Sequence, residues 1–321
     1  MNERTAEIRD LGLLSAAVVL GVTLSFEFSL IGLPLAAMGL AGLIFRGRIF
    51  PAGVAAAFGV AAVAIVQPES IIFVAPALVA VFLAVFLLPR VDAQVVGAVL
   101  TAVLSVAGAG RDYVLLKGQG TTLYAMLSSE LNKAVAQQAQ AAGGSTASTA
   151  QAMRETVGTL LSLIPMMYFV TGLVTAIAVI YGIAWAAKRS GRTVMVPPLA
   201  RLDLSPHVLW PFVIGLFALA ASYSPIAYAA TWGTVGLNLV WCCGALFSLQ
   251  GLGVSAGVLE RTGVGPGVRI LALAALAVID AFLAGIPLGF VGLVDFWVNF
   301  RRLPRDGVTP SSPNPVVSDR F

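Results

Sequence analysis

Long apolar runs separated by short polar connectors make up most of this chain. The runs are rich in alanine, leucine, valine and glycine, and they lack the apolar–polar alternation that is typical of membrane β-strands. Because a lipid-exposed backbone must satisfy its own hydrogen bonds, the runs are expected to be membrane-spanning helices. The predicted fold class is therefore all-α, a polytopic transmembrane helix bundle. About nine spans are expected, at residues 11–25, 30–45, 49–66, 70–88, 91–109, 160–187, 208–223, 228–259 and 268–284.

The C-terminal region carries one more predicted helix and a tail. Nine crossings from a cytoplasmic start would leave the basic residues near the C-terminus outside, although such residues favour the cytoplasmic side. Residues 285–287, Gly-Ile-Pro, can turn the chain, so 288–300 are expected to form a short returning or interfacial helix. Residues 1–303 are then a single integral membrane domain. Residues 304–321 contain four prolines and three serines, which predicts a disordered tail.

The region 111–157 breaks the apolar pattern. Side chains at a spacing of about four predict an amphipathic helix over 122–141, and they are Leu123, Leu127, Leu131, Val135 and Gln138. A glycine- and serine-rich turn follows, and a second helix begins near Thr149 and continues into the span at 160. We expect an extracytoplasmic helical hairpin here. The alternative is a surface excursion with no special role.

Composition indicates that lipid is the solvent for most of the chain. Charged residues make up 11% of it and hydrophobic residues 59%, whereas soluble domains carry about 25% charged residues. The basic connectors at 46–48 and Arg90 alternate along the spans with connectors that hold Glu27 and Glu69. Since basic connectors favour the cytoplasm, the N-terminus is expected to be cytoplasmic. The net charge is +4, and the lysine and arginine residues lie mostly in such connectors. The expected partner is therefore the lipid bilayer and not nucleic acid.

A few polar side chains lie inside the last apolar runs. Asp280 and Asp295 are each costly at membrane depth, by about 2.5–3.5 kcal/mol, so each needs a partner or a cavity. They are either a proton, cation or substrate site or a structural ion pair or helix cap, with Arg301 near Asp295 in sequence. The amides of Asn238 and Gln250 either line such a site or bridge helices, at about 0.6 kcal/mol per bond.

Small residues at a spacing of four predict close packing of helices. Gly253 and Gly257 follow Gln250 in one run, and the pairs Ala17/Gly21 and Gly32/Ala36 occur near the N-terminus. Such pairs let two backbones approach, and we interpret them as packing features.

Few residues have the chemistry of a catalytic or metal site. His207 is the single histidine, and Cys242 and Cys243 are adjacent within an apolar run. A zinc site needs several ligands at suitable spacing, and covalent catalysis needs a nucleophile beside a base. We therefore expect no metal, no cofactor and no catalytic residues, which disfavours an enzyme without excluding one.

The last third of the chain resembles a known family. It has a proline-rich connector at 196–211, then LNLVWCCGALFSLQGLG at 237–253 and LGFVGLVDFWVNFRR at 288–302. With the earlier proline-containing span LSLIPMMYFVTG, this order resembles the YybS-like family of bacterial polytopic membrane proteins, a family of unknown function. The matching positions are Gln250, Gly251, Gly292, Asp295, Trp297, Phe300 and Arg301. The resemblance implies a bacterial cytoplasmic membrane. It also implies a loose likeness to the substrate-binding S subunits of energy-coupling-factor vitamin transporters, although this chain has more predicted spans and an inserted hairpin.

Two functions follow from these patterns. The first is a transport-type bundle with a small-molecule or ion site, lined by Asn238, Gln250 and Asp280. The second is a scaffold or subunit of a membrane complex, in which Asp295, Trp297 and Arg301 form a docking element and the hairpin meets a membrane-protein partner.

Overall fold

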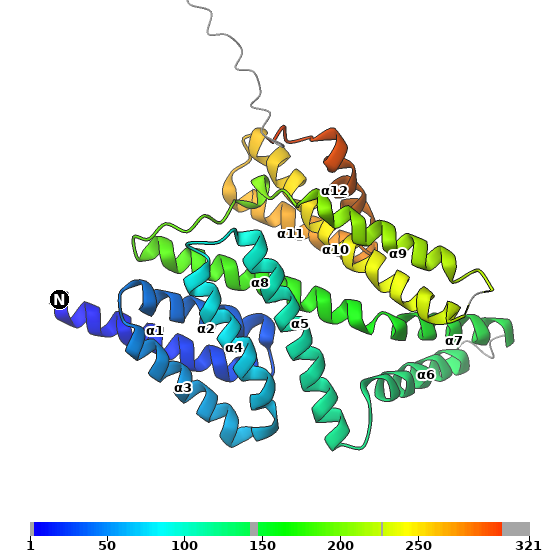
Figure 1. The fold of residues 1–321 in the computed structure, drawn as a ribbon, viewed down its shortest axis with the longest axis horizontal. Coiled ribbons are helices and arrows are strands. Elements are labelled where there is room, and N and C mark those ends of the chain that lie inside the picture. The colour runs from blue at the N-terminus through cyan, green and yellow to red at the C-terminus, as the bar shows by residue number, and fades with distance from the viewer. Residues whose placement is uncertain (1–2, 142–146, 226, 304–321) are drawn as a thin grey trace, which may run out of the picture. The chain divides into compact units, whose positions relative to one another are not determined.

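Helices account for all the regular structure in residues 3–141, 147–225 and 227–303, the parts of the chain that the computed structural model describes (Figure 1). The α-helices are α1 (Glu3–Ser25), α2 (Ser29–Phe45), α3 (Ile49–Val66), α4 (Ile71–Leu87), α5 (Ala93–Gly118), α6 (Leu123–Ala141), α7 (Ala147–Ser162), α8 (Ile164–Arg189), α9 (Leu209–Ala221), α10 (Ala229–Arg261), α11 (Pro266–Phe282) and α12 (Ile286–Val298). Short 3-10 turns lie at Pro68–Ser70, Leu199–Arg201 and Pro206–Val208. The all-α prediction is confirmed for these residues, and the predicted tail at 304–321 lies outside them.

The structure has fewer candidate membrane spans than the nine predicted. Six helices are long and apolar enough to cross a bilayer, namely α1, α3, α4 with the turn before it, α5, α8 and α10. The bent pair α11–α12 makes a seventh if it is counted as one broken span, and α2 and α9 are shorter. With 17 residues, α2 rises about 25 Å at about 1.5 Å per residue, less than the roughly 30 Å of a hydrocarbon core. The count of nine spans is therefore not confirmed.

The chain forms two compact units, described separately below. The first unit comprises Met1–Val196 and Phe212–Cys242, and the second comprises Pro197–Pro211 and Cys243–Phe321. The interpretation of 1–303 as a single membrane domain stays a prediction.

Six helices of the first unit, α1–α5 and α8, pack into a bundle (Figure 1). α1 lies on α2 and α3, α2 lies on α8, and α5 lies between α4 and α8. Its core is apolar, and Leu40, Val81 and Ile183 are fully buried. α1 and α2 approach so closely that a Cβ on Gly21 would overlap the backbone of Ala36. Each of these two residues belongs to one of the predicted small-residue pairs.

Two helices in contact, α6 and α7, occupy the region of the predicted hairpin, but they begin after its predicted start at 111, and the extracytoplasmic position stays a prediction. α5 continues to Gly118, beyond the predicted end of the fifth span at 109, and its Arg111 and Asp112 form an ion pair within the helix. The half-buried side chains of α6 include Leu123, Leu127, Leu131 and Val135, which agrees with the amphipathic pattern, and Gln138 falls outside the described side chains. α7 does not run into α8, since the helix breaks at Leu163, just before Pro165.

In the second unit the chain turns sharply between α11 and α12. The two helices are bent by 107°, and Gly285 at the turn has a φ of +72°, which glycine tolerates and other residues rarely adopt. The expected turn is present two residues earlier than predicted, at 283–285, and the short last helix begins at Ile286 instead of 288. α12 lies against the second half of α10, where a Cβ on Gly292 would overlap the carbonyl oxygen of Phe247.

Candidate functional site

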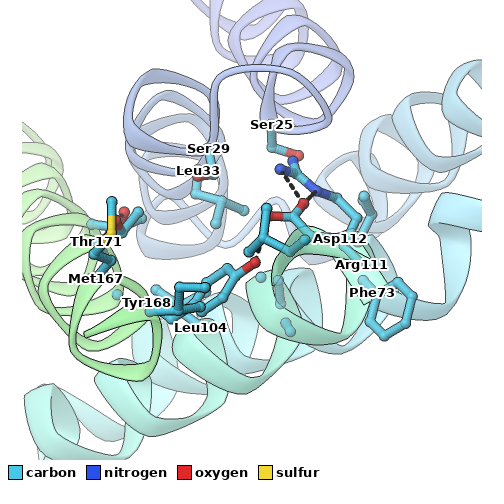
Figure 2. Close-up of a pocket in the computed structure, with 18 of the residues that line it drawn as sticks. Ser25, Ser29, Leu33, Phe73, Leu104, Arg111, Asp112, Met167, Tyr168 and Thr171 are labelled. Carbon is cyan, nitrogen blue, oxygen red and sulfur yellow. Dashed lines mark hydrogen bonds and ion pairs between the residues drawn. The ribbon is translucent and has the colours of Figure 1, made fainter. Parts of the chain in front are cut away.

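A cavity of about 350 Å³ lies at one end of the bundle in the first unit. Its walls come from the end of α1, the beginnings of α2, α4 and α8, and the C-terminal half of α5. Most of the lining is apolar, with Leu33, Phe73, Leu104 and Met167 as its larger side chains (Figure 2). The volume falls in the range of about 300–1,000 Å³ that is typical of small-molecule sites.

One side of the cavity carries three linked polar side chains, Arg111, Asp112 and Tyr168 (Figure 2). The guanidinium of Arg111 donates from Nε to Oδ1 of Asp112 over 3.0 Å, and its Nη2 lies 2.9 Å from the same oxygen. The other carboxylate oxygen, Oδ2, accepts a hydrogen bond of 2.8 Å from the Tyr168 hydroxyl. Nη1 of Arg111 donates to the backbone oxygen of Phe26 over 2.5 Å. The ion pair thus joins α5 to α8 and to the α1–α2 connector.

Glycines on α5 and α8 allow these helices to pack closely against their neighbours, which brings the linked side chains within reach of one another. A Cβ on Gly172 would lie 2.8 Å from the Thr101 oxygen of α5, and one on Gly110 would overlap the ring of Phe73. The apolar face of α5 faces the bundle, with Leu100 and Leu104 buried. This packing turns the polar last third of α5 toward the cavity.

Hydroxyl groups add further polar positions to the cavity wall. Ser25 and Thr175 donate to backbone oxygens of their own helices, Val22 and Thr171, over 2.7 Å each. A hydroxyl that donates in this way still accepts a hydrogen bond through its lone pairs. Ser29 and Thr171 also line the cavity.

The hairpin reaches the cavity through its first helix. Leu123 and Leu127, one turn apart on α6, are lining residues, and so is Ile164 at the start of α8. The amphipathic stripe that the sequence reveals therefore covers part of a cavity, at least at its N-terminal end.

Binding is the chemistry that the cavity offers. Within the described residues, no group of three or more His, Cys, Asp or Glu side chains could hold a metal ion. The polar set combines one cation, one anion and a phenol, of which the carboxylate is already held by the other two. These groups orient a ligand by hydrogen bonds, and none of them is a nucleophile placed beside a free base.

Three of the residues singled out from the sequence meet in the second unit, and none of them lines the cavity described above. Arg301 pairs with Asp295 over 2.8 Å, and the Gln250 amide donates to the same carboxylate oxygen over 3.2 Å. All three are buried, with exposed fractions of 5%, 0% and 0%. Arg301 also lies 3.5 Å from Asp203, a residue that sequence reasoning missed.

This ionic cluster fastens the connector before α9 to α10 and α12. Gln250 accepts from the Leu204 backbone N–H over 2.8 Å, and Arg301 donates to the backbone oxygens of Leu202 and Ala200. The small pair on α10 makes room for it, since a Cβ on Gly253 would lie 2.9 Å from the Leu199 oxygen. Gly253 and Gly257 were predicted to pack against another helix. In the structure they pack against the connector before α9 and the Arg301 side chain instead.

Asp280 and Asn238 act as caps for helices that cannot cap themselves. α8 and α12 both begin with Ile-Pro, after Leu163 and Gly285, and neither of these preceding residues makes a side-chain cap. Oδ1 of Asp280 accepts from the backbone N–H of Leu288, the third residue of α12, over 2.8 Å. Asn238 accepts equivalently from Met166 in α8 over 3.0 Å and donates to the Ser162 oxygen over 2.7 Å.

Trp297 stands apart from the other candidates. Its side chain is 69% exposed on α12, so it does not join the ionic cluster. Of the six candidates, the structure thus brings Gln250, Asp295 and Arg301 together and places the other three elsewhere.

The capping role of Asp280 gives a testable expectation. Asp280→Ala should cost about 1–2 kcal/mol of unfolding free energy, because the first turn of α12 loses its acceptor. Asp280→Asn should cost only a few tenths of that, since an amide oxygen also caps. Denaturation of the purified protein in detergent measures both variants. Equal losses for the two would mean that the charge matters more than the cap.

The residues around the cavity are difficult to identify from the sequence alone. Arg111 and Asp112 follow an apolar run and resemble the start of a polar connector. The signal that could have found them is their opposite charge at adjacent positions, because a neutral pair is compatible with a continuing membrane helix.

Comparison with known proteins places the chain in a family. Among curated proteins and solved structures, none matches the chain. A family model described as a predicted membrane protein (DUF2232) matches residues 11–296. Since this match covers most of the chain and agrees with the YybS-like resemblance, the chain belongs to this family of predicted membrane proteins of unknown function.

Proposed function

We propose that this protein binds a small molecule in the cavity of its first unit and acts as a transport-type membrane protein. The observation that carries the proposal is the cavity itself, about 350 Å³ with apolar walls and one polar side. A largely apolar pocket with a few convergent polar groups is the usual form of a ligand site. The proposed site is thus Arg111, Asp112 and Tyr168 with the surrounding apolar wall.

The position of the cavity along the bundle supports uptake from outside the cell. The cavity lies at the end of α1 and the start of α4, next to the connectors that hold Glu27 and Glu69. The positive-inside pattern predicts that these acidic connectors are extracytoplasmic. With a cytoplasmic N-terminus in a bacterial plasma membrane, the cavity would face the side from which a nutrient arrives.

The resemblance to S subunits points the same way. Those subunits are small helical bundles that bind substrate, and the bundle in the first unit consists of α1–α5 and α8. The remaining helices would then be additions to such a bundle.

A scaffold that docks a partner through Asp295, Trp297 and Arg301 has less support. Asp295 and Arg301 are buried against each other, so they do not present a surface. Of the three, only Trp297 is exposed. An exposed tryptophan is also typical of the membrane–water interface, so its exposure does not by itself indicate a protein partner.

A cavity-filling variant tests the proposal. Ala107 of α5 lines the cavity, and Ala107→Phe should fill much of it. Ala102→Phe places the same ring on the exposed face of the same helix and serves as the control. Each protein is purified in detergent, and the small molecules that it releases on denaturation are identified by mass spectrometry.

We expect a small molecule that co-purifies with the wild type and with Ala102→Phe but falls at least tenfold with Ala107→Phe. Uptake of that molecule by cells producing Ala107→Phe should fall in parallel. Equal recovery from all three proteins would contradict a site in this cavity. So would the absence of any molecule enriched over an unrelated membrane protein purified alongside.

A further inference from the structure

We infer that the ligand of this cavity carries no net charge and is apolar over most of its surface, with a polar group at one end. This inference rests on the proposed function and names the class of ligand. It follows from the charge balance of the cavity and from how its polar groups are already used.

The charges that line the cavity cancel. Among its described lining residues only Arg111 and Asp112 are charged, and they form an ion pair of 2.9 Å. A charged ligand in a poorly hydrated site needs an opposite charge, because burial of an unpaired ion is costly. This cavity offers neither a spare cation nor a spare anion.

The protein itself satisfies the pair on several sides. Asp112 accepts from Arg111 through one carboxylate oxygen and from Tyr168 through the other. Arg111 is further held by the Phe26 backbone oxygen. A carboxylate or phosphate on a ligand would have to share Arg111 with Asp112, and an ammonium would have to share Asp112 with Arg111, so neither ion would find an uncompensated opposite charge.

What remains for a ligand is directional hydrogen bonding by neutral groups. The Tyr168 hydroxyl donates to Asp112, so its oxygen is left to accept from a ligand N–H or O–H. The hydroxyls of Ser29 and Thr171 line the same space, as Figure 2 shows. The ring of Phe73 and the side chain of Leu104 line the same space and are apolar.

Three probes with one ring system and different charges test this inference. They are indole-3-acetamide (neutral), indole-3-acetate (anionic) and tryptamine (cationic). Binding of each to the purified full chain in detergent is measured by isothermal titration at neutral pH, with Ala107→Phe as the blocked control. The wild type should bind the neutral amide at least tenfold more tightly than either ion.

Two charge variants should then reverse the preference. Asp112→Asn leaves Arg111 uncompensated and should favour the anion, whereas Arg111→Gln leaves Asp112 uncompensated and should favour the cation. The double variant Arg111→Gln with Asp112→Asn should again prefer the neutral amide, which keeps the test valid if one single variant folds poorly.

The outcomes separate the two proposals. If an ion binds the wild type most tightly and Ala107→Phe blocks it, the site is right and the ligand class is wrong. If no probe shows binding that Ala107→Phe blocks, both proposals fail for this cavity. A preference that stays the same in the wild type and in both single variants would also overturn the charge argument.

Discussion

Replacing Arg301 by alanine should cost about 3–5 kcal/mol of unfolding free energy, because Asp295 would be left as a buried charge without its partner. The two side chains are 2% and 0% exposed, so the pair lies in a poorly hydrated environment where a missing counter-charge is costly. The connector would also lose the bonds from Arg301 to the oxygens of Ala200 and Leu202. Heating the protein with a thiol-reactive dye measures the effect, since Cys243 in the second unit is buried.

A second substitution separates the lost charge from lost packing. Adding Asp295→Asn to Arg301→Ala should recover part of the stability, because the carboxylate that lost its cation is replaced by a neutral amide. Arg201→Ala, which removes an exposed arginine from the same unit, should change the midpoint little. If Arg301→Ala and Arg201→Ala behave alike, the ionic cluster is not a stabilising feature.

Sequence reasoning reached the helical class and much of the local detail. The turn near Gly285, the short last helix and the amphipathic face of α6 each depend on a local pattern, and the structure has all three, with the turn two residues earlier than predicted. Such features are set by a few neighbouring residues, so a pattern along the chain is enough to find them.

The candidate site was harder to predict because it depends on contacts between distant segments. The cavity joins residues from α1 to α8, and the Tyr168–Asp112 bond spans 56 positions. The sequence instead drew attention to Asp280, an isolated carboxylate in an apolar run. Its partner is a backbone N–H on the next helix, and no pattern of side chains reveals a bond of that kind. The count of nine spans was not confirmed for another reason, since α2 is strongly apolar and yet short.

The same substitution at two glycines of α10 should have opposite effects. A Cβ on Gly251 would overlap the backbone oxygen of Leu288 in α12, whereas a Cβ on Gly244 would meet no atom within 4 Å. Alanine favours a helix over glycine by about 1 kcal/mol. Gly244→Ala should therefore be neutral or stabilising by up to about 1 kcal/mol.

Gly251→Ala should cost about 3 kcal/mol, at the upper end of the cost of overpacking, because the obstacle is backbone, which cannot move aside like a flexible side chain. The thermal midpoint of the two variants, followed by the reaction of Cys243, makes the comparison within one helix. A loss in both would point to a general intolerance of α10 to substitution. A loss in Gly251→Ala alone would mean that the close approach of α10 and α12 holds α12 in place. The Gln-Gly pair of the YybS-like pattern would then have two structural tasks in adjacent residues, with Gln250 binding the ionic cluster and Gly251 admitting the backbone of α12.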